Sequence, residues 1–379
     1  MKKNRRYLRA SALLAAALLT AGLPAAALQT AKASQLTACA ADENYTYGEN
    51  DTFSYKKFSD HIEISSLKTD PSTLEIPSSI DGLPVTSIGI YACQFKSMST
   101  LILPDTLKEI GMYTFSYCSN LKELTIPDSV TKIRLRAFEE CPALATINFP
   151  DHPVETDEFT FNNTPWLHAQ RKKDPLVIVN NVVIDGRTCK GDVTVPANVK
   201  YVAGSAFAGN EDITSVVFPS GVSLIEASTF RNCKNLASAE LKGATQLGYG
   251  VFEGCNSLTD LKISGKLTRI DYYSFTDNNA TATITFYGSR STWEQVEKPE
   301  NDPFLSRATM IFDESHSDTD EVPGDINGDS VCDGLDAVLL QKYLLTTGSL
   351  TEAQAKIADM NADGKLSAAD LTLLKREYL

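Results

Sequence analysis

Two twelve-residue segments near the carboxyl terminus carry the side chains best suited to chemistry. D-I-N-G-D-S-V-C-D-G-L-D spans Asp325–Asp336, and D-M-N-A-D-G-K-L-S-A-A-D spans Asp359–Asp370. In both segments, oxygen-bearing side chains occupy positions 1, 3, 5, 9 and 12, and position 7 offers its backbone carbonyl. Such a set suits a hard cation, whereas a softer metal prefers His or Cys. The alternative, two Asp-rich solvated turns, does not explain the matched phase, so the sequence predicts two calcium sites.

Each loop is followed by an amphipathic segment, Ala337–Leu345 or Leu371–Leu379. Both segments begin where the last loop carboxylate would cap a helix and meet its positive end. An ordinary EF-hand has a helix on each side of its loop and Glu at position 12. Here position 12 is Asp twice, and only Pro323 and Gly324 precede the first loop. This duplicated pattern over Gly324–Leu379 resembles the type I dockerin module, which docks onto a cohesin of a cellulosome scaffold.

The dockerin resemblance implies one ligand set for each loop. The first set is Asp325, Asn327, Asp329, the Val331 carbonyl, Asp333 and Asp336, and the second is Asp359, Asn361, Asp363, the Lys365 carbonyl, Ser367 and Asp370. Ser367 would act through a water. Position 6 normally needs Gly for its sharp turn. Gly364 meets this need and Ser330 does not, which predicts strain in the first loop.

The resemblance also implies which residues would face a cohesin. They are Gly334, Leu335, Gln341 and Lys342 in the first repeat, and Ala368, Ala369, Lys375 and Arg376 in the second. The two sets differ chemically, which argues against docking in two equivalent orientations. Plain solvent exposure is the alternative role for any one of these residues.

The first forty residues have the features of a secretory signal peptide. A basic start is followed by an Ala/Leu-rich stretch, Ala10–Leu28, and by small residues up to Ala40, where cleavage is expected. A retained membrane anchor, or a lipoprotein-type cleavage at Leu36–Cys39, is the alternative. Removal of the six basic residues in 1–40 leaves 29 basic and 48 acidic residues, a net charge near −19. Nucleic acid is therefore excluded as a partner. No other apolar run approaches a membrane span, so stable membrane insertion is not expected.

Between these ends, the chain repeats itself. Short apolar runs end in proline at Pro77, Pro104, Pro127, Pro150, Pro196 and Pro219, with steps of 27, 23, 23, 46 and 23 residues. A second marker keeps the same period at Phe115, Phe138, Phe207, Phe230, Phe252 and Phe275. A period near 23 is too short for helix pairs and fits one coil of a leucine-rich solenoid.

The segment Leu121–Pro127 illustrates one coil. Alternation sends Leu124 and Ile126 inward, and proline ends the strand. Because one coil cannot bury its apolar face alone, about nine or ten coils are expected to stack. The pattern over roughly Ile62–Phe312 resembles the BspA-like leucine-rich repeats of bacterial surface and secreted proteins. This resemblance implies a fold of the α+β repeat class with short parallel strands, followed by a small all-α calcium-binding module.

The expected organisation follows from these patterns. It comprises a signal peptide (1–40), an N-terminal cap (41–61), the solenoid (62–312) with an insertion near 151–192 and a C-terminal cap near 288–312, an acidic linker (313–323) and the dockerin (324–379). Within the insertion, the apolar runs on either side of Asn180 and Asn181 predict a hairpin. The insertion either re-aims the solenoid, forms a binding feature or has no function.

Eight cysteines in a secreted chain invite a disulfide framework. However, Cys118, Cys141, Cys233 and Cys255 each lie three residues after the repeat Phe, a position that Asn210 fills in another coil. This register favours free thiols on a buried ladder. A disulfide between stacked cysteines, such as Cys118 and Cys141, is the alternative.

No catalytic constellation is evident. None of His61, His152, His168 and His316 forms a metal-binding or nucleophile pattern. The pairs Glu139–Glu140 and Glu211–Asp212 are expected on a solvated face. The outward residues of the strands are mostly short and polar, which does not favour polysaccharide binding there. Tyr91, Tyr113 and Tyr273 share one position on another side and form an interrupted stripe. A place at the edge or rim of the core is the simplest interpretation, and an exposed patch is the alternative.

The sequence therefore predicts a secreted, non-catalytic component of a cellulosome. Its calcium-loaded tail would bind a scaffold cohesin, and its repeats would bind a protein or cell-surface partner in the context of polysaccharide degradation. A carbohydrate-binding component, or an enzyme that hydrolyses glycosides, is the alternative.

Overall fold

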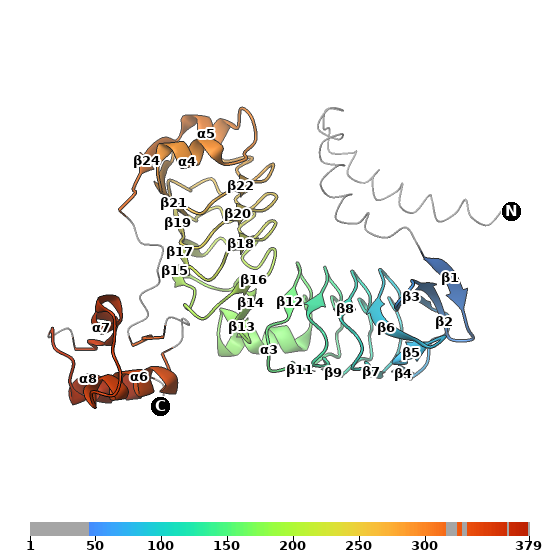
Figure 1. Cartoon of the computed structure of the whole chain (residues 1–379). Helices are drawn as coiled ribbons and strands as arrows, with labels where there is room; N and C mark the ends of the chain where they lie inside the picture. Colours follow the sequence, from blue (N-terminus) through green and yellow to red (C-terminus); the bar gives the residue numbers. More distant parts are fainter. Residues whose placement is uncertain (1–44, 316–323, 328–331, 362–363, 378–379) are drawn as a thin grey trace.

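The computed structural model describes residues 45–315, 324–327, 332–361 and 364–377 (Figure 1). The expected signal peptide therefore lies outside the described residues, as does most of the acidic linker. The described chain begins with three antiparallel strands, β1 (Thr46–Glu49), β2 (Phe53–Lys57) and β3 (Ile62–Leu67). β3 then pairs in parallel with β6, which starts the solenoid. Within the described residues, no helix has both the length and the apolar character needed to cross a membrane.

The solenoid makes about eleven turns, one or two more than the sequence predicted. Its first row of strands is β4 (Thr73–Glu75), β7 (Thr100–Ile102), β9 (Glu123–Thr125), β11 (Thr146–Asn148), β15 (Gly191–Thr194), β17 (Ile213–Phe218), β19 (Ser238–Leu241), β21 (Asp260–Ser264), β23 (Thr283–Tyr287) and β24 (Thr309–Phe312). Its second row is β6 (Leu83–Ile88), β8 (Glu109–Ile110), β10 (Lys132–Ile133), β12 (Glu155–Thr156), β14 (Val182–Asp185), β16 (Tyr201–Val202), β18 (Leu224–Ile225), β20 (Gln246–Leu247) and β22 (Arg269–Ile270). Two short strands lie outside these rows, β5 (Ser79–Ile80) and β13 (Val177–Val179).

Each coil buries the residues that the alternation predicted. Leu124 and Ile126 are buried while Thr125 between them is exposed, and β9 pairs in parallel with β11. Val130 and Ile133 point into the core from the next side, and Phe138 fills the third. Because every coil repeats these positions, the apolar side chains stack into a continuous core.

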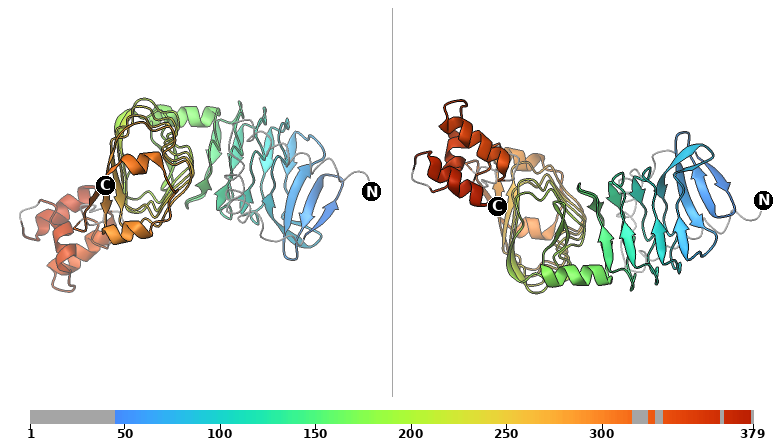
Figure 2. Two further views of the ribbon diagram at one scale, coloured as in Figure 1. Left: turned by 90° about the horizontal axis from the view of Figure 1, so that it is seen from above. Right: turned by 90° about the horizontal axis from the view of Figure 1, so that it is seen from below.

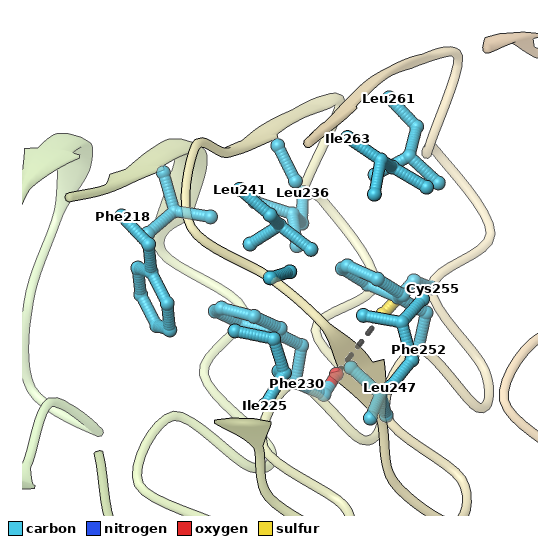
Figure 3. Close-up of a cluster of buried hydrophobic side chains, with 14 of the residues drawn as sticks. Phe218, Ile225, Phe230, Leu236, Leu241, Leu247, Phe252, Cys255, Leu261 and Ile263 are labelled. Carbon is cyan, nitrogen blue, oxygen red and sulfur yellow. Dashed lines mark hydrogen bonds between the residues drawn. The ribbon is translucent and has the colours of Figure 1, made fainter. Parts of the chain in front are cut away.

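The repeat phenylalanines form a stacked column inside the solenoid (Figure 3). The ring centroids of Phe230 and Phe252 lie 5.2 Å apart, and those of Phe252 and Phe275 lie 5.7 Å apart. Beside the column, the Cys255 thiol donates a hydrogen bond to the Phe230 carbonyl at 2.9 Å. Cys233 bonds the Phe207 carbonyl in the same way.

The expectation of free thiols on a buried ladder is confirmed for Cys118, Cys141, Cys233 and Cys255. Burial raises the pKa of the Cys118, Cys141 and Cys233 thiols to about 12. These thiols therefore stay protonated near neutral pH and act as small core residues whose S–H groups satisfy backbone carbonyls.

The solenoid is divided into two stacks. The strand rows break after β11 and β12, and new rows begin at β14 and β15. The core divides at the same place, into one cluster that ends near Val177 and another that begins near Val183. In Figure 2, the turns of the C-terminal stack superimpose as a closed outline while the N-terminal stack is seen from the side. The axes of the two stacks therefore point in different directions.

Helix α3 (Pro165–Lys173) replaces a strand at this junction. The Thr164 hydroxyl caps it by accepting the Leu167 N–H, and proline occupies its first turn. The predicted hairpin follows as β13 and β14, with Asn180 and Asn181 both in the left-handed backbone region of its turn. Of the three roles left open for the insertion, the structure supports re-aiming of the solenoid.

A buried ionic network spans the junction. The Asp185 carboxylate, 2% exposed, accepts two hydrogen bonds from Arg171 on α3 at 2.8 Å. It accepts two more from Arg187, one from the side chain at 2.6 Å and one from the backbone N–H at 3.2 Å. Arg187 also donates to the Asn162 side chain, and Asn162 donates to Glu139. The expectation that Glu139 is solvated is therefore wrong. Glu139 is buried because Arg136 and Asn162 neutralise and satisfy it.

The C-terminal end of the solenoid is covered by two short helices, α4 (Arg290–Gln295) and α5 (Pro303–Arg307). Trp293 and Phe304 bury their rings against the last turns, as a terminal cap requires. The tail contains α6 (Gly334–Leu344), α7 (Glu352–Ala358) and α8 (Ala368–Glu377). Its core is small, and the buried apolar side chains among its described residues are Ile326, Ala337, Leu340, Ala358 and Leu374.

Candidate functional site

The first Asp-rich loop closes onto its own last residue. Asp336 is fully buried, and its Oδ1 accepts the N–H groups of Ile326 at 2.8 Å and Asn327 at 2.9 Å. Its Oδ2 accepts the Asp333 N–H at 2.9 Å. The Asp333 side chain in turn accepts the Leu335 N–H at 2.7 Å, which makes it the N-cap of α6. A carboxylate at position 12 thus ties the start of the loop to the helix that follows it.

The second loop repeats this arrangement. Asp370 is fully buried, and its carboxylate accepts N–H groups of Asn361 at 3.4 Å and Ser367 at 2.8 Å. These donors occupy the same loop positions, 3 and 9, as two of the donors to Asp336. Gly364 has φ +79°, and a Cβ there would have open space. Gly is therefore needed for its backbone conformation and not for room.

The described residues include most of the predicted calcium ligands. Asp325, Asn327, Asp333, Asp336, Asp359, Asn361, Lys365, Ser367 and Asp370 all lie in the two loops. Asp329, Val331 and Asp363 fall outside the described residues, and so does Ser330. Within the described part of the chain, no three acidic, His or Cys side chains group closely enough to hold a metal.

The charge balance of the loops fits a bound cation. Asp336 and Asp370 each lie at 0% exposure. Among the described residues, backbone N–H groups and the Ser367 hydroxyl donate hydrogen bonds to them, and no lysine or arginine does. An ionised carboxylate that is buried without a counter-charge is costly. Oxygen ligands and an uncompensated negative charge are the features that suit Ca²⁺.

All eight residues of the predicted cohesin face are exposed. Gly334, Leu335, Gln341 and Lys342 lie on α6, and Ala368, Ala369, Lys375 and Arg376 lie on α8. Leu335 is 63% exposed, and Val338 on the same helix is 44% exposed. The surface of α6 therefore offers apolar contact area that α8 does not match, which agrees with the chemical difference seen in the sequence.

The solenoid brings no nucleophile and base together in its described residues. The ring of His61 bonds Asp60, that of His152 bonds two backbone carbonyls, and that of His168 bonds no serine or cysteine. His316 lies outside the described residues.

Three partly buried carboxylates lie near the junction of the two stacks. Burial raises the pKa of Asp157, Glu158 and Glu226 above the usual range, and Tyr201 donates to Glu226 at 3.0 Å. The cavity beside Asp157 measures about 10 Å³, which is the space of one water and far less than a sugar ring. Acids with a raised pKa occur in glycosidases, but this corner has no room for their substrate.

The outward face of the first strand row is mostly polar, as predicted. Thr125 and Asn148 are exposed there, and the Asn148 amide donates to both Glu123 and Thr125. Exposed aromatic side chains gather instead on the turns that flank the repeat phenylalanines. Tyr91 is 43% exposed, Phe95 67% and Tyr117 44%. For Tyr91 the sequence analysis left open a core edge or rim and an exposed patch, and an exposure of 43% agrees with a rim position or a patch.

Two family profiles match the chain. The profile of the BspA type leucine-rich repeat region matches residues 86–174 and 187–295 in six copies, which together exceed half of the 379 residues. The chain belongs to the BspA-type leucine-rich repeat family. The profile of the dockerin type I domain matches residues 323–379, so the tail is a type I dockerin domain. The gap between the two matched BspA-type ranges contains the hairpin β13–β14, where the repeat register is interrupted.

Solved structures of other leucine-rich repeat proteins are similar to this BspA-type solenoid. A leucine-rich repeat protein of T. pallidum has 26% identity and a TM-score of 0.34, over 56% of this chain and 91% of that one. A leucine-rich cell surface protein of Faecalibacterium prausnitzii has 18% identity and a TM-score of 0.33, over 69% and 100%. No curated protein matches.

Proposed function

We propose that this protein is a secreted, non-catalytic adaptor of a cellulosome. Its dockerin binds a cohesin of a scaffold protein when loaded with calcium, and its repeats hold a protein or cell-surface partner beside the scaffold. A type I dockerin domain indicates cohesin binding, and leucine-rich repeats indicate protein interaction. The benefit of the arrangement is effective concentration, since docking keeps the repeats close to the polysaccharide-degrading enzymes of the scaffold.

The main support for calcium binding is the pair of buried carboxylates at loop position 12. Asp336 and Asp370 each fix the N–H groups of loop positions 3 and 9 and have no basic partner among the described residues. We propose that each closes a site for one Ca²⁺, with the remaining ligands as the dockerin resemblance implies. The ion supplies positive charge there, while the chain itself orders the loop and caps the following helix.

The experiment is capture of the full chain by immobilised cohesin modules. Capture is expected in millimolar Ca²⁺ and is expected to be lost in excess EGTA and restored by added Ca²⁺. A matched variant, Asp192→Asn, changes an exposed solenoid carboxylate and should be captured as the parent is. Capture that is unchanged in EGTA would overturn the calcium-dependent docking.

Non-catalytic action of the repeats is supported by the small cavity beside Asp157 and by the thiols that burial keeps protonated. Its test is turnover of pectin, xylan and cellulose by the purified chain. Release of reducing sugar that disappears in a Glu158→Gln variant would favour the alternative of a glycoside-hydrolysing enzyme. Binding of these polymers without turnover would favour a carbohydrate-binding component.

A further inference from the structure

Helix α7 lies between the two Asp-rich loops in the sequence and is fixed at its start by a capping box. The Thr351 hydroxyl accepts the Gln354 N–H at 3.2 Å, and the side-chain oxygen of Gln354 accepts the Thr351 N–H at 2.9 Å. The helix ends at Ala358, and its C-cap is Asp359, which is position 1 of the second loop. The last residue of α7 is therefore followed directly by a proposed calcium ligand.

The side chain of Gln354 has a second partner, which lies in the first loop. Its Nε2 donates to the Ile326 carbonyl at 2.9 Å, from a residue 28 positions away in the sequence. Ile326 stands between Asp325 and Asn327, two of the proposed calcium ligands, and its own N–H donates to the Asp336 carboxylate. Only an amide can satisfy both partners of Gln354, because one partner is an N–H group and the other is a carbonyl.

The chain that enters the first loop also lies against the second repeat. The Gly324 N–H donates to the Ile357 carbonyl, near the end of α7, at 3.0 Å. Gly324 has φ +84°, and a Cβ at this position would lie 3.2 Å from the Met360 sulfur and 3.3 Å from Cγ of Leu374. Met360 is position 2 of the second loop, so the start of one loop is in contact with the start of the other.

The two repeats share one small core. Ile326 of the first loop and Ala358 of α7 are buried in the same cluster as Leu340 of α6 and Leu374 of α8. In the second loop, the Met360 N–H donates to the Ala358 carbonyl at 3.0 Å. Position 2 of each loop is thus bonded to α7. Ordering of one loop therefore lowers the entropic cost of ordering the other.

We propose that α7 couples the two calcium sites, so that filling either site favours filling the other, and that Gln354 positions the first loop for this coupling. The inference rests on the proposed function, in which each loop binds one Ca²⁺. Gln354 acts through Ile326, the residue between two ligands, and is itself a positioning residue. Because coupling between binding sites is reciprocal, loss of either site should weaken the other by the same factor.

Three substitutions separate the contact with the first loop from the helix cap. Gln354→Glu keeps the side-chain oxygen that completes the capping box with Thr351, and it loses the N–H donor to Ile326. Its added negative charge would by itself favour Ca²⁺, so charge does not explain a weaker first site. Thr351→Ala removes the cap hydroxyl and leaves the bond between Gln354 and Ile326. Asp370→Asn disables the second loop.

The experiment is a calcium titration of the full chain followed by hydrogen exchange. The amides of α6 report on the first loop, and those of α8 report on the second. In the parent, both helices should become protected at the same Ca²⁺ concentration, and Asp370→Asn should raise the midpoint of α6 about tenfold. In the Gln354→Glu background this shift should fall to about twofold, because losing one hydrogen bond corresponds to about a fivefold change. In the Thr351→Ala background it should stay about tenfold.

Four results would overturn the inference. They are an α6 midpoint that Asp370→Asn leaves unchanged, a shift that keeps its full size in Gln354→Glu, an equal reduction of the shift by Thr351→Ala, and loss of α6 protection at every Ca²⁺ concentration in Gln354→Glu. In all four cases calcium still orders the parent, so the proposed calcium sites stand. If Ca²⁺ protects neither α6 nor α8 in the parent, the calcium sites of the proposed function fail together with the coupling.

Discussion

The solenoid and the dockerin neutralise buried carboxylates in different ways. In the solenoid, Asp185 lies between Arg171 and Arg187, and Glu139 pairs with Arg136. In the dockerin, Asp336 and Asp370 are equally buried, but among the described residues only N–H and O–H groups bond to them. The solenoid therefore carries its counter-charges in its own sequence, and we propose that the dockerin takes its counter-charges from solution as Ca²⁺.

The hydrophobic cores of the solenoid and the dockerin also differ in size. The solenoid buries a continuous column of phenylalanines with aliphatic neighbours in every turn. Five apolar side chains are fully buried in the described part of the dockerin: Ile326, Ala337, Leu340, Ala358 and Leu374. Small domains with so little core usually need a metal or a disulfide. We therefore propose that the fold of the dockerin depends on a bound ion, whereas the fold of the solenoid does not.

The largest expected effect comes from removing the buried charges of the dockerin. The double variant Asp336→Asn with Asp370→Asn should lose calcium binding and cohesin capture, because each loop loses a carboxylate that ties it together. In the parent, Ca²⁺ at a hundredfold excess over its dissociation constant is expected to stabilise the module by about 2.7 kcal/mol for each of the two proposed sites. Calorimetry and thermal melts should show this gain abolished in the variant. If the melting temperature of the double variant still rises when Ca²⁺ is added, the proposed difference between dockerin and solenoid is contradicted.

The same substitution in the solenoid should destabilise without any link to calcium. Asp185→Asn leaves the partly buried guanidinium groups of Arg171 and Arg187 beside a neutral partner and should lower the free energy of unfolding by about 3–5 kcal/mol. Chemical denaturation of the solenoid measures this loss. Glu211→Gln, in an exposed pair with Lys234, is the matched control and should change stability by less than about 1 kcal/mol. Equal effects of the two variants would contradict the account of the network.

A smaller effect is expected from the cap of the junction helix. Thr164→Ala removes the hydroxyl that accepts the Leu167 N–H and donates to the Phe161 carbonyl at 2.8 Å. The solenoid should lose about 1 kcal/mol. Thr164→Ser keeps the hydroxyl and should recover most of that loss. If both variants melt alike, the hydroxyl does not hold the junction.

The smallest effect concerns pH. Burial raises the pKa of Glu226 in the folded state, so its stabilising contribution is full below the unfolded value of about 4.5 and is lost as pH rises through the folded pKa. Glu226→Gln keeps an acceptor for the Tyr201 hydroxyl but removes the charge. The variant should therefore be more stable than the parent at pH 7, and the difference should vanish toward pH 4.5. Melting curves across this range check the sign, and a variant that is less stable at pH 7 would contradict it.

Which residues of each coil point into the core could be predicted from the sequence, because the pattern of a single coil already shows it. Leu124, Ile126, Val130 and Phe138 point inward as the alternation and the period require. The thiol ladder followed from register in the same way. The dockerin was identified because oxygen ligands at fixed spacing have few other uses.

Non-local pairings could not be predicted. Glu139 is buried because Asn162 and Arg136 reach it from positions 23 and 3 residues away. At the change of direction Asp185 pairs with Arg171, and no period in the sequence indicates this pairing. The exposure of Tyr91 depends on a left-handed backbone whose side chain turns outward, and a repeat pattern does not reveal it.

The central claim is that calcium orders the dockerin while the solenoid folds without it. Hydrogen exchange of the full chain, with millimolar Ca²⁺ and with EGTA, tests this most directly. The amides of α6, α7 and α8 should be protected with calcium and exchange freely without it, while those of β17, β19 and β21 should stay protected in both conditions. Equal protection of α6 and α8 in EGTA would contradict the account.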